Sequence, residues 1–97
     1  MTNSQIIEGV ARSVYGDEAV DSMIRSGVEI PLHTVQGWNS RGPYRVKKGE
    51  HGIETKLWKK KTGKNNDDED TDQGFYLVKS YLFTEMQVEK LEQTFIP

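Results

Sequence analysis

The first quarter of the chain places apolar residues with the period of an α-helix. One helix is predicted over residues 4–15, with Ser4 as its N-cap and Gly16 as its stop. A second helix is predicted over residues 17–26, with Asp17 as its cap. The two should form a helical hairpin, and each helix carries an apolar stripe. These stripes consist of Ile6, Ile7, Val10, Ala11 and Val14 in the first helix, and of Ala19, Val20, Met23 and Ile24 in the second.

A short third helix is predicted to begin at Thr34, because Pro31 favours extended backbone just before it. Trp38 lies within this helix and is assigned to the core, since an indole in a small protein is more often buried than exposed. Gly42 ends the helix, and Pro43 prevents its continuation.

From Tyr44 onward the period changes from that of a helix to that of a strand. Tyr44–Val46 and Ile53–Lys60 are typical of strands, and the glycines at 49 and 52 suit a turn between them. The pattern therefore predicts a β-hairpin. Side chains alternate along a strand, so one face of the second strand is apolar and the other is basic and carries Trp58. The basic face consists of Glu54, Lys56, Trp58 and Lys60.

Residues 62–74 contain no apolar residue, so they have nothing to bury that would offset the entropy lost on ordering. They are predicted to form a flexible acidic loop. Residues 75–83 are rich in aromatic and branched residues, apolar apart from Lys79 and Ser80, and are predicted to form the central strand. A C-terminal helix capped by Thr84 is predicted over residues 84–95.

These elements predict an α+β fold in which short helices and a C-terminal helix pack on a small, mainly antiparallel sheet. A chain of 97 residues is long enough for one hydrophobic core. We expect a single domain over residues 1–97, with a helical part (1–33), a helix plus the basic hairpin (34–61), the acidic loop (62–74) and the central strand with the last helix (75–97).

Charge is concentrated in blocks along the chain. The net charge is −2, yet residues 41–64 carry nine Lys or Arg against two acidic residues, a local +7, and residues 65–74 carry five acidic residues and no base. The field that a polyanion meets is the local one. The basic block therefore indicates a nucleic-acid-binding surface in spite of the acidic total.

The basic block also contains aromatic residues. Single-stranded nucleic acid is bound by cations that follow its phosphates and by aromatic rings on which its bases stack. The lysines are expected to contact phosphates with help from the arginines, and Trp58, Tyr44 and Tyr81 are expected to offer stacking faces. The predicted binding residues are Arg41, Tyr44, Arg45, Lys47, Lys48, Lys56, Trp58, Lys59, Lys60 and Tyr81. The competing interpretation is a solvated hairpin whose lysines only confer solubility.

The sequence contains few residues that are suited to catalysis or metal binding. His33 and His51 are the two histidines, and there is no cysteine, so a zinc site of three protein ligands is not expected. The acidic loop resembles a calcium loop only faintly, because Gln73 stands where an EF-hand needs glycine. We expect no enzymatic activity, no cofactor and no metal. The absence of cysteine and of an export or spanning segment favours the cytoplasm, with no membrane partner.

Three landmarks resemble a known family. They are the Val46–Gly52 run VKKGEHG, the Leu57–Lys59 run LWK, and the aromatic strand that closes as Leu82-Phe83-Thr84 before Gln87. In this order they resemble the N-terminal single-stranded-DNA-binding domain of ArdC-type antirestriction proteins. The resemblance covers about residues 34–88.

This resemblance implies a protein of phages, plasmids or conjugative elements that binds single-stranded DNA, rather than RNA, with little sequence preference. The H-E-x-x-H helix of the family's metallopeptidase-like domain does not occur in this sequence, so no catalytic role is implied. A different class of function also stays open: the acidic loop could mimic phosphates and bind a host nucleic-acid-binding defence protein, or it could compete with DNA for the basic hairpin.

Overall fold

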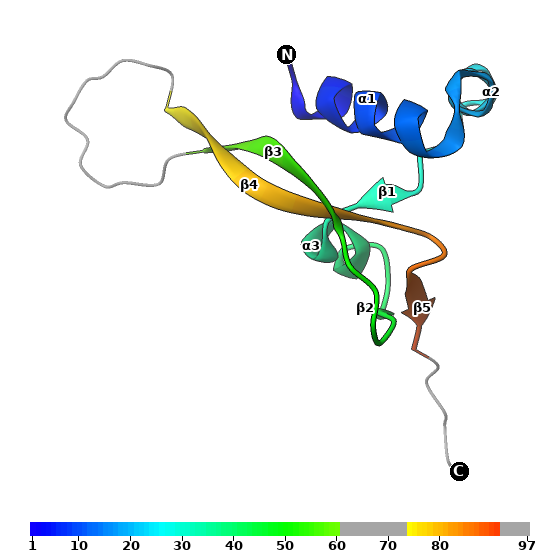
Figure 1. Cartoon of the computed structure of the whole chain (residues 1–97), viewed down its shortest axis with the longest axis vertical. Helices are drawn as coiled ribbons and strands as arrows, with labels where there is room; N and C mark the ends of the chain where they lie inside the picture. Colours follow the sequence, from blue (N-terminus) through cyan, green and yellow to red (C-terminus); the bar gives the residue numbers. More distant parts are fainter. Residues whose placement is uncertain (61–73, 92–97) are drawn as a thin grey trace, which may run out of the picture.

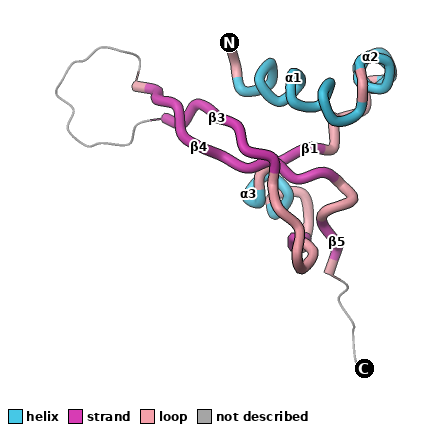
Figure 2. Tube along the Cα trace, in the orientation of Figure 1, coloured by secondary structure: helices cyan, strands magenta, loops and turns pink. Residues whose placement is uncertain are grey.

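The computed structural model describes residues 1–60 and 74–91. These residues form three helices, a three-stranded antiparallel sheet and a separate two-stranded antiparallel sheet (Figures 1 and 2). The fold class is α+β, as the sequence predicts. None of the helices in the described part of the chain has the length and apolar content needed to cross a bilayer.

The predicted helical hairpin is confirmed. Helix α1 spans Asn3–Tyr15 and helix α2 spans Asp17–Ser26. The N-cap of α1 is Thr2 rather than Ser4, because Thr2 forms a capping box with Gln5 in which each side chain accepts from the other residue's backbone N–H. Gly16, at a φ of 94°, separates the two helices, and few residues other than glycine adopt that backbone conformation.

The larger sheet has the strand order β1-β4-β3, all antiparallel. Strand β4 (Phe75–Thr84) is central, as predicted. Strand β3 (Ile53–Lys60) pairs with it along its whole length, from Ile53 opposite Leu82 to Lys60 opposite Phe75. Strand β1 (Leu32–His33) covers only the last two residues of β4 on its other side.

The predicted hairpin between residues 44–46 and 53–60 is not formed. Strand β2 (Tyr44–Val46) pairs with β5 (Val88–Lys90), and β3 pairs with β4. Eight residues of β3 find eight partners in β4, whereas a hairpin with β2 would have offered three. The longer ladder forms more backbone hydrogen bonds, although its two strands lie farther apart in the sequence.

The predicted C-terminal helix is also wrong where the structure describes it. After β4 the chain makes a tight turn, in which the Gln87 N–H donates to the Thr84 carbonyl at 3.0 Å, and then enters β5. A strand here buries Val88 against Trp38 and Phe83 and pairs its backbone with β2. The rest of the expected helix, residues 92–95, lies outside the described residues.

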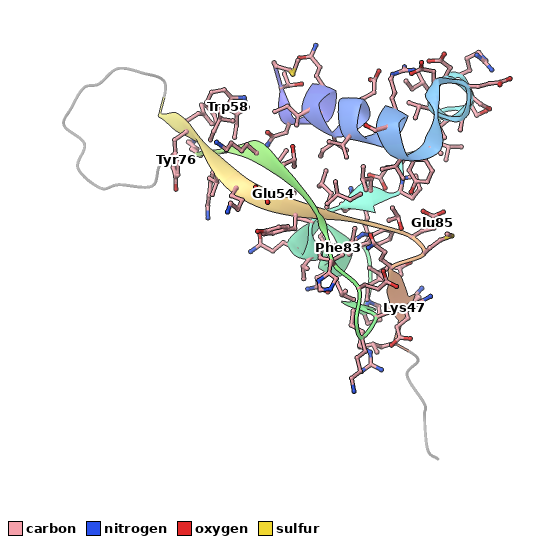
Figure 3. All side chains as sticks on the ribbon, in the orientation of Figure 1. Lys47, Glu54, Trp58, Tyr76, Phe83 and Glu85 are labelled. Carbon is pink, nitrogen blue, oxygen red and sulfur yellow. The ribbon has the colours of Figure 1, made fainter. Side chains whose placement is uncertain are left out.

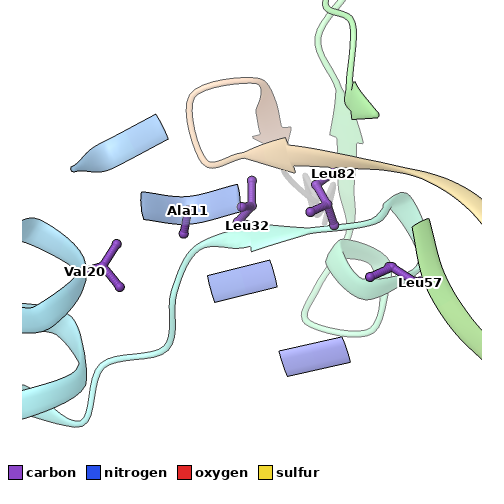
Figure 4. Packing of buried hydrophobic residues seen from close by; sticks show 5 residues of the cluster. All are labelled: Ala11, Val20, Leu32, Leu57 and Leu82. Carbon is purple, nitrogen blue, oxygen red and sulfur yellow. The ribbon is translucent and has the colours of Figure 1, made fainter. Parts of the chain in front are cut away.

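Two clusters of apolar side chains lie on opposite faces of the larger sheet. Leu82 and Phe83 are consecutive in β4 and so point to opposite sides. On the Leu82 side the cluster joins the sheet to α1 and α2 (Figure 4), and on the Phe83 side it joins the sheet to β2, β5 and helix α3 (Val35–Asn39). The first cluster contains Ala11, Val20, Leu32, Leu57 and Leu82, and the second contains Trp38, Phe83 and Val88.

The predicted burial of Trp38 is confirmed. Thr34 caps α3 as expected, with its hydroxyl accepting from the Gly37 N–H at 3.0 Å. Trp38 is 7% exposed, and its indole Nε1 donates to the Phe83 carbonyl at 2.9 Å. The rings of His33 and Tyr44 contact the indole edge-on, with centroids 4.8 and 4.9 Å away. Trp38 therefore joins α3 to both sheets.

Two glycines are expected to respond to alanine with opposite signs. A Cβ at Gly52 would lie 2.7 Å from Tyr81 Cβ and 2.7 Å from Phe83 Cζ, so Gly52→Ala should lower the free energy of unfolding by about 1–3 kcal/mol. A Cβ at Gly9, in α1, meets no atom within 4 Å, so Gly9→Ala should raise it by about 0.5–1 kcal/mol. Urea denaturation with unchanged m values measures both. A Gly52→Ala protein as stable as the parent would contradict this packing.

Candidate nucleic-acid interface

Strands β3 and β4 continue past the rest of the sheet as a two-stranded ribbon. Because β1 covers only Phe83 and Thr84, residues 75–81 of β4 have β3 as their one strand partner among the described residues. Figure 1 shows this ribbon extending past the N-terminal end of α1. We use "the ribbon" for residues 54–60 and 75–81.

The pairing register assigns the side chains of the ribbon to two faces. Residues directly opposite each other in antiparallel strands point to the same side. Trp58 is opposite Leu77, and Lys56 is opposite Lys79. Alternation then extends the assignment along both strands. The resulting surface, called the basic face below, consists of Glu54, Lys56, Trp58, Lys60, Phe75, Leu77, Lys79 and Tyr81.

The contacts of Asn3 show which backbone groups of β3 point toward β4 and which point away from it. The Asn3 side chain accepts from the Trp58 N–H at 2.7 Å and donates to the Trp58 carbonyl at 3.0 Å, so both backbone groups of Trp58 point away from β4. Trp58 and Leu77 are therefore a non-hydrogen-bonded pair, and two residues away Lys56 and Lys79 are another. In such pairs the Cα atoms approach to about 4.5 Å and the side chains lie close together.

The side chains of Lys56 and Lys79 thus leave the basic face from directly opposite positions. Within the described residues neither Lys56 nor Lys79 forms an ion pair, and the one acidic residue of this face, Glu54, lies opposite Tyr81. Like charges directly opposite each other destabilise a sheet. A bound phosphate between the two lysines would turn this repulsion into attraction.

Aromatic surface accompanies these cations. Trp58, Phe75 and Tyr81 are 38%, 51% and 45% exposed. The Trp58 indole is held in place, because its Nε1 donates to the Met1 carbonyl at 2.8 Å; Figure 3 shows the side chain beside the N-terminal end of α1. An anchored and partly exposed ring loses little rotamer entropy when a base stacks on it.

A pocket of about 560 Å³ adjoins the ribbon. Its lining includes Trp58, Lys59, Lys79 and Tyr81, together with residues 34–36 at the start of α3. Cationic and aromatic groups therefore meet at a concave part of the surface as well as along the strands.

Lys47 and Lys48, also predicted to bind, lie elsewhere. They are exposed residues of the turn that follows β2. Figure 3 labels Lys47 and Trp58 at opposite ends of the molecule. The structure thus divides the predicted set into a ribbon group, comprising Lys56, Trp58, Lys59, Lys60 and Tyr81, and a distant turn group.

The remaining predicted residues have partners in the fold. The Arg41 Nε donates to Glu29 Oε1 at 2.9 Å, and the Arg45 Nε donates to Glu89 Oε2 at 2.7 Å. Tyr44 packs against the Trp38 ring in the second apolar cluster. These contacts account for the three side chains as parts of the structure.

The Arg41–Glu29 pair also affects titration nearby. Hydrogen bonding to Arg41 lowers the pKa of Glu29, so this carboxylate stays ionised at neutral pH. Burial lowers the pKa of His33, and the positive charge of Arg41 lowers it further. His33 is therefore neutral at pH 7.

Within the described residues no group of three or more His, Asp or Glu side chains is arranged to hold a metal ion.

Two of the three landmarks of the family resemblance meet at one place in the structure, whereas the Leu57–Lys59 run lies in the ribbon. The Gln87 side chain donates to the His51 carbonyl at 2.8 Å and to Glu50 Oε1 at 3.1 Å, and its Oε1 accepts from the Thr84 N–H at 3.0 Å. The Lys47 N–H donates to the Gln87 carbonyl at 2.8 Å. Gln87 thus fastens the VKKGEHG turn to the end of β4, which gives these landmarks an architectural role.

Sequence reasoning missed Phe75, Leu77 and Lys79 as parts of the interface. Residues 75–83 look like a strand buried on both sides, and β4 is buried only at Leu82 and Phe83. The available signal was Lys79, a charge two residues from Tyr81 and hence on the same face. Residues 61–73, which contain all but Gly74 of the predicted acidic loop, lie outside the described residues.

The described residues define a class of protein: a small α+β domain that carries a basic and aromatic two-stranded ribbon. Comparisons with protein-family models, with curated proteins and with solved structures find no match to this chain.

Proposed function

We propose that this protein is a non-enzymatic module that binds single-stranded nucleic acid on the basic face of its ribbon. The observation that carries the proposal is the like-charge pair of Lys56 and Lys79 beside the exposed ring of Trp58. Cations that follow phosphates and rings that stack on bases are the two parts of such a site.

The side chains of the basic face have different roles in this proposal. Lys56 and Lys79 hold one phosphate between them, and Lys60 contacts the next phosphate toward the tip. Lys59 was also predicted to bind, but the register places it on the other face of the ribbon, so it is not part of this surface. Trp58 and Tyr81 stack on bases, at about 1–3 kcal/mol for each base. On the same face Leu77 lies between Lys79 and Phe75, Phe75 lies opposite Lys60, and both offer further apolar contact.

The preference for a single strand follows from the aromatic residues. Bases in a duplex are stacked on each other and turn their faces away from a protein, so an exposed ring gains contact only with an unpaired strand. The preference for DNA, and the setting in a mobile genetic element with a role in antirestriction or DNA transfer, rest on the ArdC-type resemblance of residues 34–88.

Binding should depend steeply on salt. For single strands the slope of log K against log salt concentration is about −0.7 per phosphate neutralised, so the three lysines of the basic face give about −2. Fluorescence anisotropy with a labelled oligonucleotide of roughly 20 nucleotides, at several salt concentrations, measures this slope. The matched duplex is the control and should bind more weakly.

An affinity that does not change with salt concentration would contradict the proposed phosphate contacts. Equal affinity for the single strand and the duplex would remove the stacking contacts, since these need unpaired bases.

A further inference from the structure

The two outer edges of the ribbon differ in how well they are protected from pairing with another strand. On β3 the Asn3 side chain satisfies both backbone groups of Trp58, in the manner of a neighbouring strand. The same strand also carries three lysines, Lys56, Lys59 and Lys60. Side chains that occupy the backbone and charges that repel a second strand are the usual means of keeping an edge unpaired.

Among the described residues the outer edge of β4 has less of this protection, because Lys79 is the one charged residue between positions 75 and 81. Because Trp58 and Leu77 are a non-hydrogen-bonded pair, the N–H and C=O of Leu77 point away from β3, and so do those of Phe75 and Lys79. The same phase holds at Phe83, whose carbonyl accepts from Trp38 on the outer side. Among the described residues no strand pairs with this edge before Phe83.

The side chains of this edge favour pairing as well. Phe75, Tyr76 and Leu77 are each exposed, and residues 75–80 include no proline and no acidic residue. An exposed and apolar strand edge of this length is a template for another strand.

We propose that the β4 edge binds the β4 edge of a second copy of this chain, antiparallel, with Leu77 on the twofold axis. In this register Phe75 lies opposite the second copy's Lys79, and Leu77 lies opposite Leu77. On the other face Tyr76 lies opposite the second copy's Val78. Each of the pairs formed by residues 75, 77 and 79 exchanges two backbone hydrogen bonds, so the outward groups of these residues are satisfied.

The charge pattern favours this register over the one centred on Lys79. With Lys79 on the axis, two ammonium groups would face each other across the strands, which destabilises a sheet. With Leu77 on the axis, Lys79 lies over the ring of Phe75 instead, where a cation is attracted. The interface uses the same patch on both copies, as a twofold dimer requires.

The dimer would join two ribbons into one four-stranded sheet. Leu77 belongs to the basic face, and residues paired across antiparallel strands share a side, so the two basic faces lie on the same side of that sheet. This inference stands on the backbone phase of β4 and does not depend on nucleic-acid binding.

Sedimentation equilibrium without nucleic acid tests the dimer. An edge interface of this size is small, so we expect the weight-average mass to rise from one chain toward two between about 10 µM and about 1 mM protein. Leu77→Pro removes an N–H that β3 does not use, and should keep the protein monomeric while the far-UV spectrum is retained. Lys56→Pro removes an outward N–H from the opposite edge and should leave dimerisation unchanged.

Leu77→Lys provides a second variant that keeps the backbone N–H and places two like charges across the axis, so it too should be monomeric. The chain contains no cysteine, so Leu77→Cys introduces its one thiol. Paired Cα atoms at about 5.5 Å suit a disulfide, and oxidation should link Leu77→Cys chains at least tenfold faster than Met86→Cys chains, whose thiol is exposed elsewhere. A mass of one chain at every concentration, or equal linking rates, would overturn the proposal.

Discussion

Replacing Trp38 with alanine is expected to lower the free energy of unfolding by about 3–5 kcal/mol. The indole fills the cluster that joins α3 to both sheets, and its removal leaves a cavity beside Phe83 and Val88. It also leaves the Phe83 carbonyl without its donor, which adds the cost of an unsatisfied buried acceptor. A loss of this size is a large part of the stability of a small domain, so Trp38→Ala is the most damaging single substitution that we foresee.

The matched control is the other tryptophan. Trp58 is more than a third exposed, so Trp58→Ala should cost about 1–2 kcal/mol of stability and instead weaken binding of a single strand by about 1–3 kcal/mol. Urea denaturation and anisotropy measure the two quantities. If Trp58→Ala were the more destabilising and Trp38→Ala the more harmful to binding by a folded protein, the two indoles would have each other's roles.

The double charge reversal Lys56→Glu with Lys79→Glu is expected to weaken binding of a single strand by roughly 100-fold or more. Each charge-assisted contact to a phosphate contributes about 1.5–3 kcal/mol, and the variant removes two of them and adds repulsion. Stability should change little, because one like-charge pair replaces another at the same place in the sheet. Anisotropy at one salt concentration, with urea denaturation alongside, measures both effects.

Lys47→Glu with Lys48→Glu is the control for net charge. It changes the total charge by the same amount in the turn after β2, away from the ribbon. Binding should weaken less than tenfold, through the long-range field that salt screens. Equal losses in the two double variants would mean that the protein attracts nucleic acid by its overall charge and that the ribbon is no special site.

The single variant Lys56→Glu separates folding from binding further. It converts the like-charge pair with Lys79 into a pair of opposite charges, so the free energy of unfolding should rise by about 0.2–1 kcal/mol while affinity falls. A stability gain that accompanies a loss of binding is expected where a repulsive pair serves a ligand.

The family resemblance draws on residues that hold the fold together. Gln87 connects Glu50 and His51 to Thr84, so the motif that suggested a binding hairpin describes a fastened turn. The binding residues that we propose come from the strands on either side of the 61–73 segment. The VKKGEHG motif and the binding surface that we propose therefore lie in different parts of the domain.

Local signals in the sequence determined the elements whose hydrogen bonds are local. The two N-terminal helices follow from their apolar period and glycine stops, and α3 follows from the cap at Thr34. The alternation of β3 follows from period two, and the central position of β4 follows from its apolar content. For the three helices, the hydrogen-bonding and capping residues lie within the element or beside it in the chain.

Only the tertiary structure decided which strands pair, and the site depends on that choice. By sequence alone, residues 44–46 suit one strand of a hairpin, and residues 84–91 are compatible with a helix. In the structure Val88 packs beside Trp38 and Phe83, and residues 88–90 pair with residues 44–46. Pairing β3 with β4 then places Lys79 opposite Lys56, two lysines separated by 22 intervening residues. Strand pairing is a long-range interaction, and its free energy comes from all the hydrogen bonds of the ladder and from the burial of side chains. A local sequence pattern therefore cannot predict which strands pair.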